Sequence, residues 1–162
     1  MISPESRRLR NAAWFSFAAH LVAGLAMLFV LQRGLATNPS VKDRMLYVAI
    51  YRWEWRLGWL TWNVAAIAVL IFFRRFADAH AADEAPIARR CRLAGQLVIA
   101  AVALDLAAEF LLMFRLPALG LKGNPAVFLA AERMAVLMTG FGATALYTAC
   151  ALLLALSTRR SY

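Results

Sequence analysis

The chain has 162 residues, of which 63% are hydrophobic and only 17% are charged. Soluble domains average about 45–50% apolar and about 25% charged residues. Here the apolar residues gather in long runs, which excludes an ordinary soluble domain and predicts an integral membrane protein. The net charge of +9 does not indicate nucleic acid. The basic residues flank the apolar runs, where they orient spans and contact anionic lipid head groups.

Four apolar runs are long enough to cross a bilayer, which takes about 20 residues of helix. The first begins after an arginine cluster, as in a signal peptide, but it is longer than the 7–15 residues, roughly, of a signal-peptide core. None shows the period-2 alternation of a membrane β-barrel. The sequence therefore predicts an all-α integral membrane protein, a four-transmembrane-helix bundle in a single domain over 1–162. Its spans lie at about 12–31, 57–73, 93–114 and 134–156.

Residues 41–56, "VKDRMLYVAIYRWEWR", are too polar for a span. They predict either an interfacial helix or a helical extension of the second span. Four tryptophans gather where that span begins, at positions 53, 55, 59 and 62. Tryptophan concentrates at the membrane–water boundary, so we expect an aromatic belt there, with a wall for a stacked ligand as the alternative.

The arrangement of basic residues predicts the orientation. With four spans both ends of the chain lie on one side, and the arginines of that side stand tightly at span ends, in "SRRLR", "FFRR" and "ARRCR". Positive residues beside spans favour the cytoplasm. We therefore expect a multi-pass protein with both termini in the cytoplasm.

Two acids stand inside the third apolar run, in "VALDLAAEFLL". Asp105 and Glu109 are four residues apart and share one helix face. An isolated charge at the bilayer centre costs roughly 2.5–3.5 kcal/mol on insertion scales. Either the two carboxyl groups face a polar interior or at least one of them carries a proton.

Other polar and aromatic side chains fall at a similar depth, and with the two acids they form our candidate ligand-binding set: Asp105, Glu109, His20, Asn63, Trp59, Trp62 and Tyr147. Turned inward, they would line a pocket that opens to the outside. Acids beside aromatic rings suit a cation. Two alternatives remain: Asp105 bonds His20 or Asn63 and holds helices together, a contact that contributes only about 0.6 kcal/mol, or the acids meet another subunit.

We predict no metal and no cofactor. His20, Asp105 and Glu109 are metal-ligand types, but they show no spacing signature. The second histidine, His80, lies in a predicted loop, so bis-histidine haem ligation is hard to build, and a pigment on His20 is a minor alternative. The two cysteines have no metal-type spacing. No phosphate-binding loop and no zinc-protease, serine-hydrolase or dinucleotide motif is found.

The function that we expect is binding or handling of a small lipophilic or cationic molecule, or of a proton-coupled substrate. One alternative is an accessory subunit of a larger membrane complex, or a homo-oligomer. Another is an intramembrane enzyme that uses Asp105 or Glu109 as general acid. In size, in its four spans and in its intramembrane acids near tryptophans, the chain resembles the emopamil-binding and sigma-2-receptor class of sterol-handling proteins. No motif aligns residue by residue, so no site residue is transferred.

Overall fold

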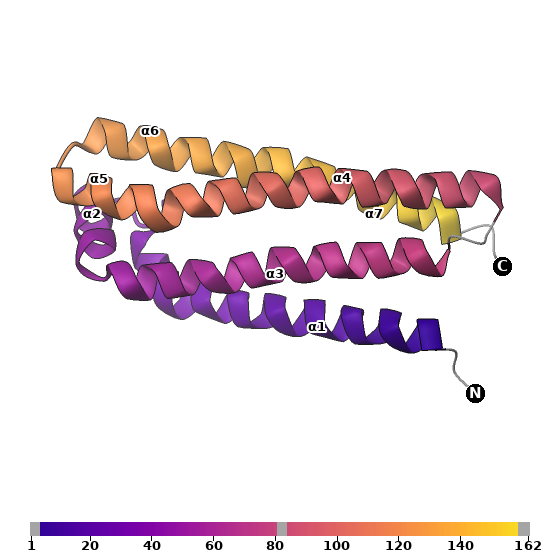
Figure 1. Cartoon of the computed structure of the whole chain (residues 1–162). Coiled ribbons are helices and arrows are strands. Elements are labelled where there is room, and N and C mark those ends of the chain that lie inside the picture. Colours follow the sequence, from indigo (N-terminus) through magenta and orange to yellow (C-terminus); the bar gives the residue numbers. More distant parts are fainter. Residues whose placement is uncertain (1–3, 81–83, 159–162) are drawn as a thin grey trace.

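The computed structural model describes residues 4–80 and 84–158, and this part of the chain is helical apart from short turns and contains no strand. Four long helical rods are found in this part of the chain, and they run side by side in alternating directions (Figure 1). The start of α1 and the end of α7 lie at one end of the bundle, and α2 and α5 lie at the other.

Each rod is long and apolar enough to cross a membrane, so the predicted number of long apolar helices is confirmed. The first consists of α1 (Pro4–Ala26), the π-helix η1 (Met27–Leu31) and the 3₁₀ turn η2 (Gln32–Gly34). The second is α3 (Arg52–Ala79). The third joins α4 (Ala85–Phe110), the π-helix η3 (Leu111–Arg115) and α5 (Leu116–Lys122). The fourth joins α6 (Pro125–Val136), the π-helix η4 (Leu137–Ala143) and α7 (Thr144–Thr158).

The segment at 41–56 divides into a separate helix and an extension of the helix that follows. Residues 41–50 form the separate helix α2 (Val41–Ile50), whose first turn is capped by the Ser40 hydroxyl, which accepts a bond from the Asp43 N–H at 3.3 Å. Tyr51 leaves helical geometry, with φ −94° and ψ 38°. Residues 52–56 are the first turns of α3, which form the predicted helical extension before the second apolar run.

The third rod continues through Pro117, although proline disfavours the interior of a helix. In η3 the Leu116 N–H bonds to the carbonyl of Leu111, and proline has no N–H to offer the preceding turn. The two carbonyls left free are bonded from α3. The Trp55 indole N–H donates to Leu112 O at 2.7 Å, and Arg56 Nε donates to Met113 O at 3.1 Å. The turn comes only at Gly123, whose φ of 68° favours glycine.

A buried cluster closes the end of the bundle that carries α2, η2 and α5, which we call the capped end. Its largest fully buried side chains are Trp55, Phe128, Leu31, Leu116 and Val48. Helix α5 lies so close to α2 that a Cβ on Gly120 would stand 2.6 Å from the Met45 carbonyl oxygen. This close backbone packing and the buried cluster close one end of the bundle.

Two of the four tryptophans of the predicted belt lie inside the bundle. Trp55 is completely buried and Trp59 is 6% exposed, whereas Trp53 is 62% exposed. Positions 55, 59 and 62 are spaced by four and three residues, so they share one helix face. That face turns into the bundle, and only Trp53 stands on the outer face.

The four rods are packed unequally. α1 packs along α3, α3 along α4, and α4 along η4 and α7, whereas α1 makes at most marginal contact with α6, η4 and α7. Accordingly, 28% and 39% of the most apolar stretch is buried in the second and third rods, against 17% and 11% in the first and fourth. The first and fourth rods therefore border an open seam along one side of the bundle.

Candidate functional site

A cavity of about 560 Å³ lies between the rods, beneath the cap. All four rods contribute to its wall: His20, Met27, Trp59, Trp62, Ala66, Val69, Phe73, Asp105, Glu109, Thr139, Thr144, Tyr147 and Ala151. Six of the seven candidate residues from the sequence border this one cavity. Asn63 does not, because its amide nitrogen donates to Trp59 O at 3.0 Å and to the Met113 sulfur at 3.5 Å.

The two acids of the third rod reach the cavity without a basic partner. Glu109 is 4% exposed and Asp105 is half-buried. The ion pairs found among the described residues use other acids, namely Glu132 and Asp78. One oxygen of each cavity acid, Asp105 Oδ1 and Glu109 Oε2, is buried and has no hydrogen-bond partner in the described chain.

Three hydrogen-bond donors beside these acids are also unpartnered in the described ranges: the indole N–H groups of Trp59 and Trp62 and the hydroxyl of Tyr147. The Tyr147 hydroxyl lies beside the Asp105 carboxyl group, outside the geometry of a hydrogen bond. Across residues 4–80 and 84–158, buried side-chain N and O atoms without a partner number six, and five of them belong to residues of this cavity. Because the great majority of buried polar atoms are bonded in native proteins, this concentration marks the cavity as unusual.

His20 stands at the edge of the cavity. Its Nδ1 donates to the Ser16 carbonyl at 2.7 Å, which leaves Nε2 as the acceptor when the ring is neutral. The ring lies edge-on to Trp62, with centroids 6.4 Å apart. The bond that the sequence suggested between Asp105 and His20 is absent from the hydrogen bonds of the described residues.

The fourth rod widens where it borders the cavity. The Thr144 hydroxyl donates to Thr139 O, five residues earlier, at 3.0 Å, within the π-helical stretch η4. π-helical turns inside α-helices occur frequently at functional sites. The sequence signal was the pair Gly140 and Gly142, which is typical of a kink, and Gly142 packs so closely on α4 that a Cβ would lie 3.2 Å from Leu104.

The first and fourth rods, which border the seam, both line this cavity. The capped end is closed by α2 and α5, and the second, third and fourth rods pack continuously around the other sides. Packing thus favours an opening through the side of the bundle, not through its end as the depth of the polar groups suggested.

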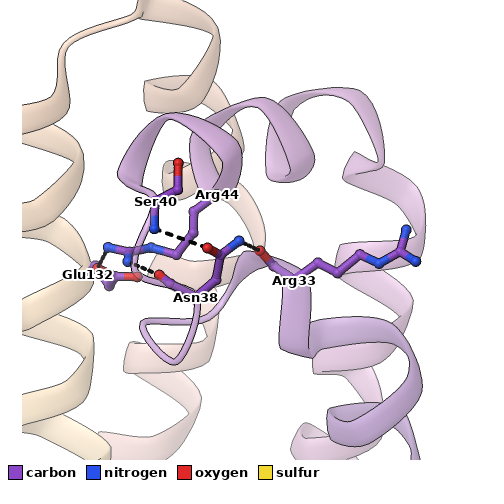
Figure 2. Close-up of polar contacts among 5 residues, drawn as sticks. All are labelled: Arg33, Asn38, Ser40, Arg44 and Glu132. Carbon is purple, nitrogen blue, oxygen red and sulfur yellow. Dashed lines mark hydrogen bonds and ion pairs between the residues drawn. The ribbon is translucent and has the colours of Figure 1, made fainter.

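A second polar cluster, which the sequence did not predict, lies in the cap. Arg44 Nη2 donates to Glu132 Oε2 at 2.8 Å, and Arg44 Nη1 donates to Asn38 O at 2.5 Å. Figure 2 shows Asn38 at the centre of this cluster, where it links the η2 turn to the start of α2. Its Nδ2 donates to Arg33 O, and its Oδ1 accepts from the Ser40 N–H, both at 3.0 Å. Arg44 and Glu132 are 88 residues apart in the chain, so no local pattern could reveal the pair.

No protein-family model, no curated protein and no solved structure matches this chain. Among the described residues, no group of three or more histidine, cysteine or acidic side chains is arranged to hold a metal ion.

Proposed function

We propose that this protein is a multi-pass membrane protein that binds a small lipophilic cation in the cavity between its four spans. The observation that carries the proposal is the gathering of five unpartnered buried polar atoms on residues of that single cavity, within the part of the chain that the structure describes. A ligand that enters the cavity would supply contacts that these residues do not find in the chain, after small side-chain rotations.

The sign of the ligand's charge follows from the lining. Among the described residues, two carboxyl groups border the cavity and no arginine or lysine does. Aromatic faces of Trp59, Trp62 and Tyr147 border it as well, and such faces attract cations. An anion would meet repulsion and an apolar wall, whereas an organic cation would meet both an ion-pair partner and ring faces.

The membrane setting belongs to the same proposal. We place both termini in the cytoplasm, because arginines stand at the span ends on their side. These arginines would also contact anionic lipid head groups. Cysteine-specific labelling from outside should then reach a cysteine placed at Gly123 and should not reach one placed at Ala82, a position outside the described residues.

Binding of benzyltrimethylammonium to the protein in lipid nanodiscs tests the function. Its uncharged carbon isostere, neopentylbenzene, has nearly the same shape. Asp105→Asn should weaken binding of the cation at least about tenfold, because a partner of the charge is lost. The isostere should not compete with the cation.

Asp78→Asn is the matched control. It removes an acid whose side chain is 72% exposed and whose ion pair, to Arg75, spans 3.9 Å. Its affinity for the cation should equal that of the wild type. Equal affinity of the Asp105→Asn protein for benzyltrimethylammonium, or competition by neopentylbenzene, would contradict the proposal.

A second candidate function, a subunit of a larger membrane complex or a homo-oligomer, is favoured by the small buried shares of the first and fourth rods, 17% and 11%. A helix from another chain lying in the seam would cover the cavity. Native mass spectrometry from mild detergent separates the two, since a species of a single chain, 17.9 kDa, argues against the assembly. The enzyme alternative uses the same carboxyl groups as general acid, and only turnover of a substrate would support it.

A further inference from the structure

The cavity is a long slot. On α3 its lining runs along one helix face from Trp59 to Phe73, a distance of about 21 Å at 1.5 Å per residue. On the fourth rod it runs from Thr139 to Ala151, about 18 Å by the same measure. A ligand that fills the slot is therefore elongated and lies along the helices.

The register between the third and fourth rods shows which parts of the slot lie at the same level. Gly142 packs against Leu104, next to Asp105. Cys150, adjacent to Ala151, donates through its sulfur to Ala94 O at 3.3 Å. Asp105 is eleven positions after Ala94 in α4, so the Ala151 end of the slot lies about 16 Å from the acid pair along the helix.

Polarity changes over this distance. The half nearer the cap holds both carboxyl groups and the unpartnered indole N–H groups of Trp59 and Trp62. The half nearer the chain termini is lined on α3 by Ala66, Val69 and Phe73 and on α7 by Ala151, beyond Tyr147. No charged side chain of the described residues borders that half. One end of the slot suits a cationic head and the other suits a hydrocarbon chain.

We propose that the ligand is a single-chain cationic amphiphile, with its head group at Asp105 and Glu109 and its chain along Phe73 and Ala151. This inference rests on the proposed function and names the class of its ligand. The open seam between the first and fourth rods supports it, because an amphiphile dissolved in the bilayer can enter sideways without drawing its chain through water. A compact cation would fill only the acidic half.

The test compares two cations with the same quaternary head, dodecyltrimethylammonium and benzyltrimethylammonium, on the full chain in nanodiscs. Ala151→Trp fills the chain end of the slot at a residue that is itself exposed. It should lower the ratio of dodecyl to benzyl affinity at least about tenfold, which corresponds to the burial of roughly two methylene groups. Ala151→Leu, a smaller addition, should lower it less and serves if the tryptophan variant does not fold.

Ala103→Trp is the matched control, because Ala103 is exposed on α4 and does not border the cavity. The affinity ratio of this variant should equal the wild-type ratio. If both probes bind, Asp105→Asn weakens both, and neither Ala151 variant changes the ratio, the amphiphile is excluded while the proposed cation site stands. If neither probe binds the wild type, the proposed function itself fails.

Discussion

Two glutamates of this protein are almost equally buried, but only one of them has a basic partner. Glu132, in the cap, is 7% exposed and Glu109, in the cavity, is 4% exposed. Glu132 accepts a hydrogen bond from Arg44 and forms an ion pair with it at 2.8 Å. Glu109 has no ion-pair partner among the described residues, and its Oε2 is buried there without a hydrogen-bond partner.

This difference indicates that buried polar groups stabilise the fold in the cap but not in the cavity. In the cap, even the carbonyls freed by the η3 turn are bonded by Trp55 and Arg56. The same fold therefore can satisfy buried polar groups, and in the cavity it does not. Among the described residues, unpartnered buried groups are concentrated in the cavity, with Arg44 Nε in the cap as the one exception. This concentration is better explained by a ligand than by loose packing throughout the bundle.

Matched amide substitutions should separate the two glutamates most strongly. Glu132→Gln leaves the buried Arg44 charge without compensation and should lower the free energy of unfolding by about 3 kcal/mol. Glu109→Gln breaks no ion pair and should change it by less than about 1 kcal/mol. Unfolding in detergent followed by circular dichroism measures both.

The control for this comparison removes both partners of the ion pair. Arg44→Leu with Glu132→Leu leaves no isolated charge and should recover most of the stability that Glu132→Gln loses. A Glu109→Gln protein as unstable as Glu132→Gln would erase the contrast between the two sites.

A methyl group added to a glycine tests how tightly the cap is packed. Gly120→Ala forces a Cβ to 2.6 Å from the rigid Met45 carbonyl, and overpacking of this kind costs about 1–3 kcal/mol. At Gly24, inside α1, a Cβ would meet no described atom within 4 Å. Gly24→Ala should therefore leave stability unchanged or raise it by up to about 1 kcal/mol. Thermal unfolding of the two variants measures this difference, and equal melting temperatures would show that α2 and α5 can move apart to accommodate the added methyl group.

The smallest effect is expected at Tyr47, whose hydroxyl donates to the Val30 carbonyl in η1. Tyr47→Phe should cost about 0.5–1.5 kcal/mol near neutral pH. Burial raises the pKa of this phenol above its usual value of 10.0, and Glu54 and Tyr51 raise it further against the opposing effect of Arg33.

The sign of the pH dependence follows from that raised pKa. The folded state holds the phenol proton more tightly than the unfolded state does, so the stabilisation is fully present below pH 10.0. It is lost as the pH rises through the folded-state pKa. Denaturation titrations at increasing pH should show the wild type losing this advantage over Tyr47→Phe, and a constant difference up to strongly alkaline pH would argue against it.

The sequence was sufficient for the number and rough position of the helices, because twenty-residue apolar runs leave few structural choices. It was less sufficient for their ends. Pro117 predicts a break, but side chains from another helix bond the carbonyls that the proline and the π-turn leave free. Such compensation is a tertiary effect and has no local signature.

The cavity residues were chosen by depth, and depth alone brought six of the seven to one place. Asn63 does not line the cavity, because its side-chain amide, four residues after Trp59, bonds the backbone of its own helix. The spacing of Trp55, Trp59 and Trp62 already favoured one shared face, but composition near a span end suggested the lipid boundary. Facing direction depends on the neighbours of a helix, which a single sequence does not reveal.

The π-helical segment in the fourth rod has a consequence for insertions and deletions. Each residue of an α-helix rotates the following side chains by about 100° around the helix axis. Ala135, before η4, and Cys150, after it, are both fully buried, so the wide turn keeps the two halves of the rod in phase with α4. Deleting one residue within Leu137–Ala143 should return this stretch to a regular α-helix and leave Tyr147 and Ala151 facing the slot, because the wide turn holds about one residue more than an α-helix needs for the same rotation. Deleting one residue between Thr144 and Tyr147 should instead rotate Tyr147 and Ala151 away from the slot by about a quarter turn.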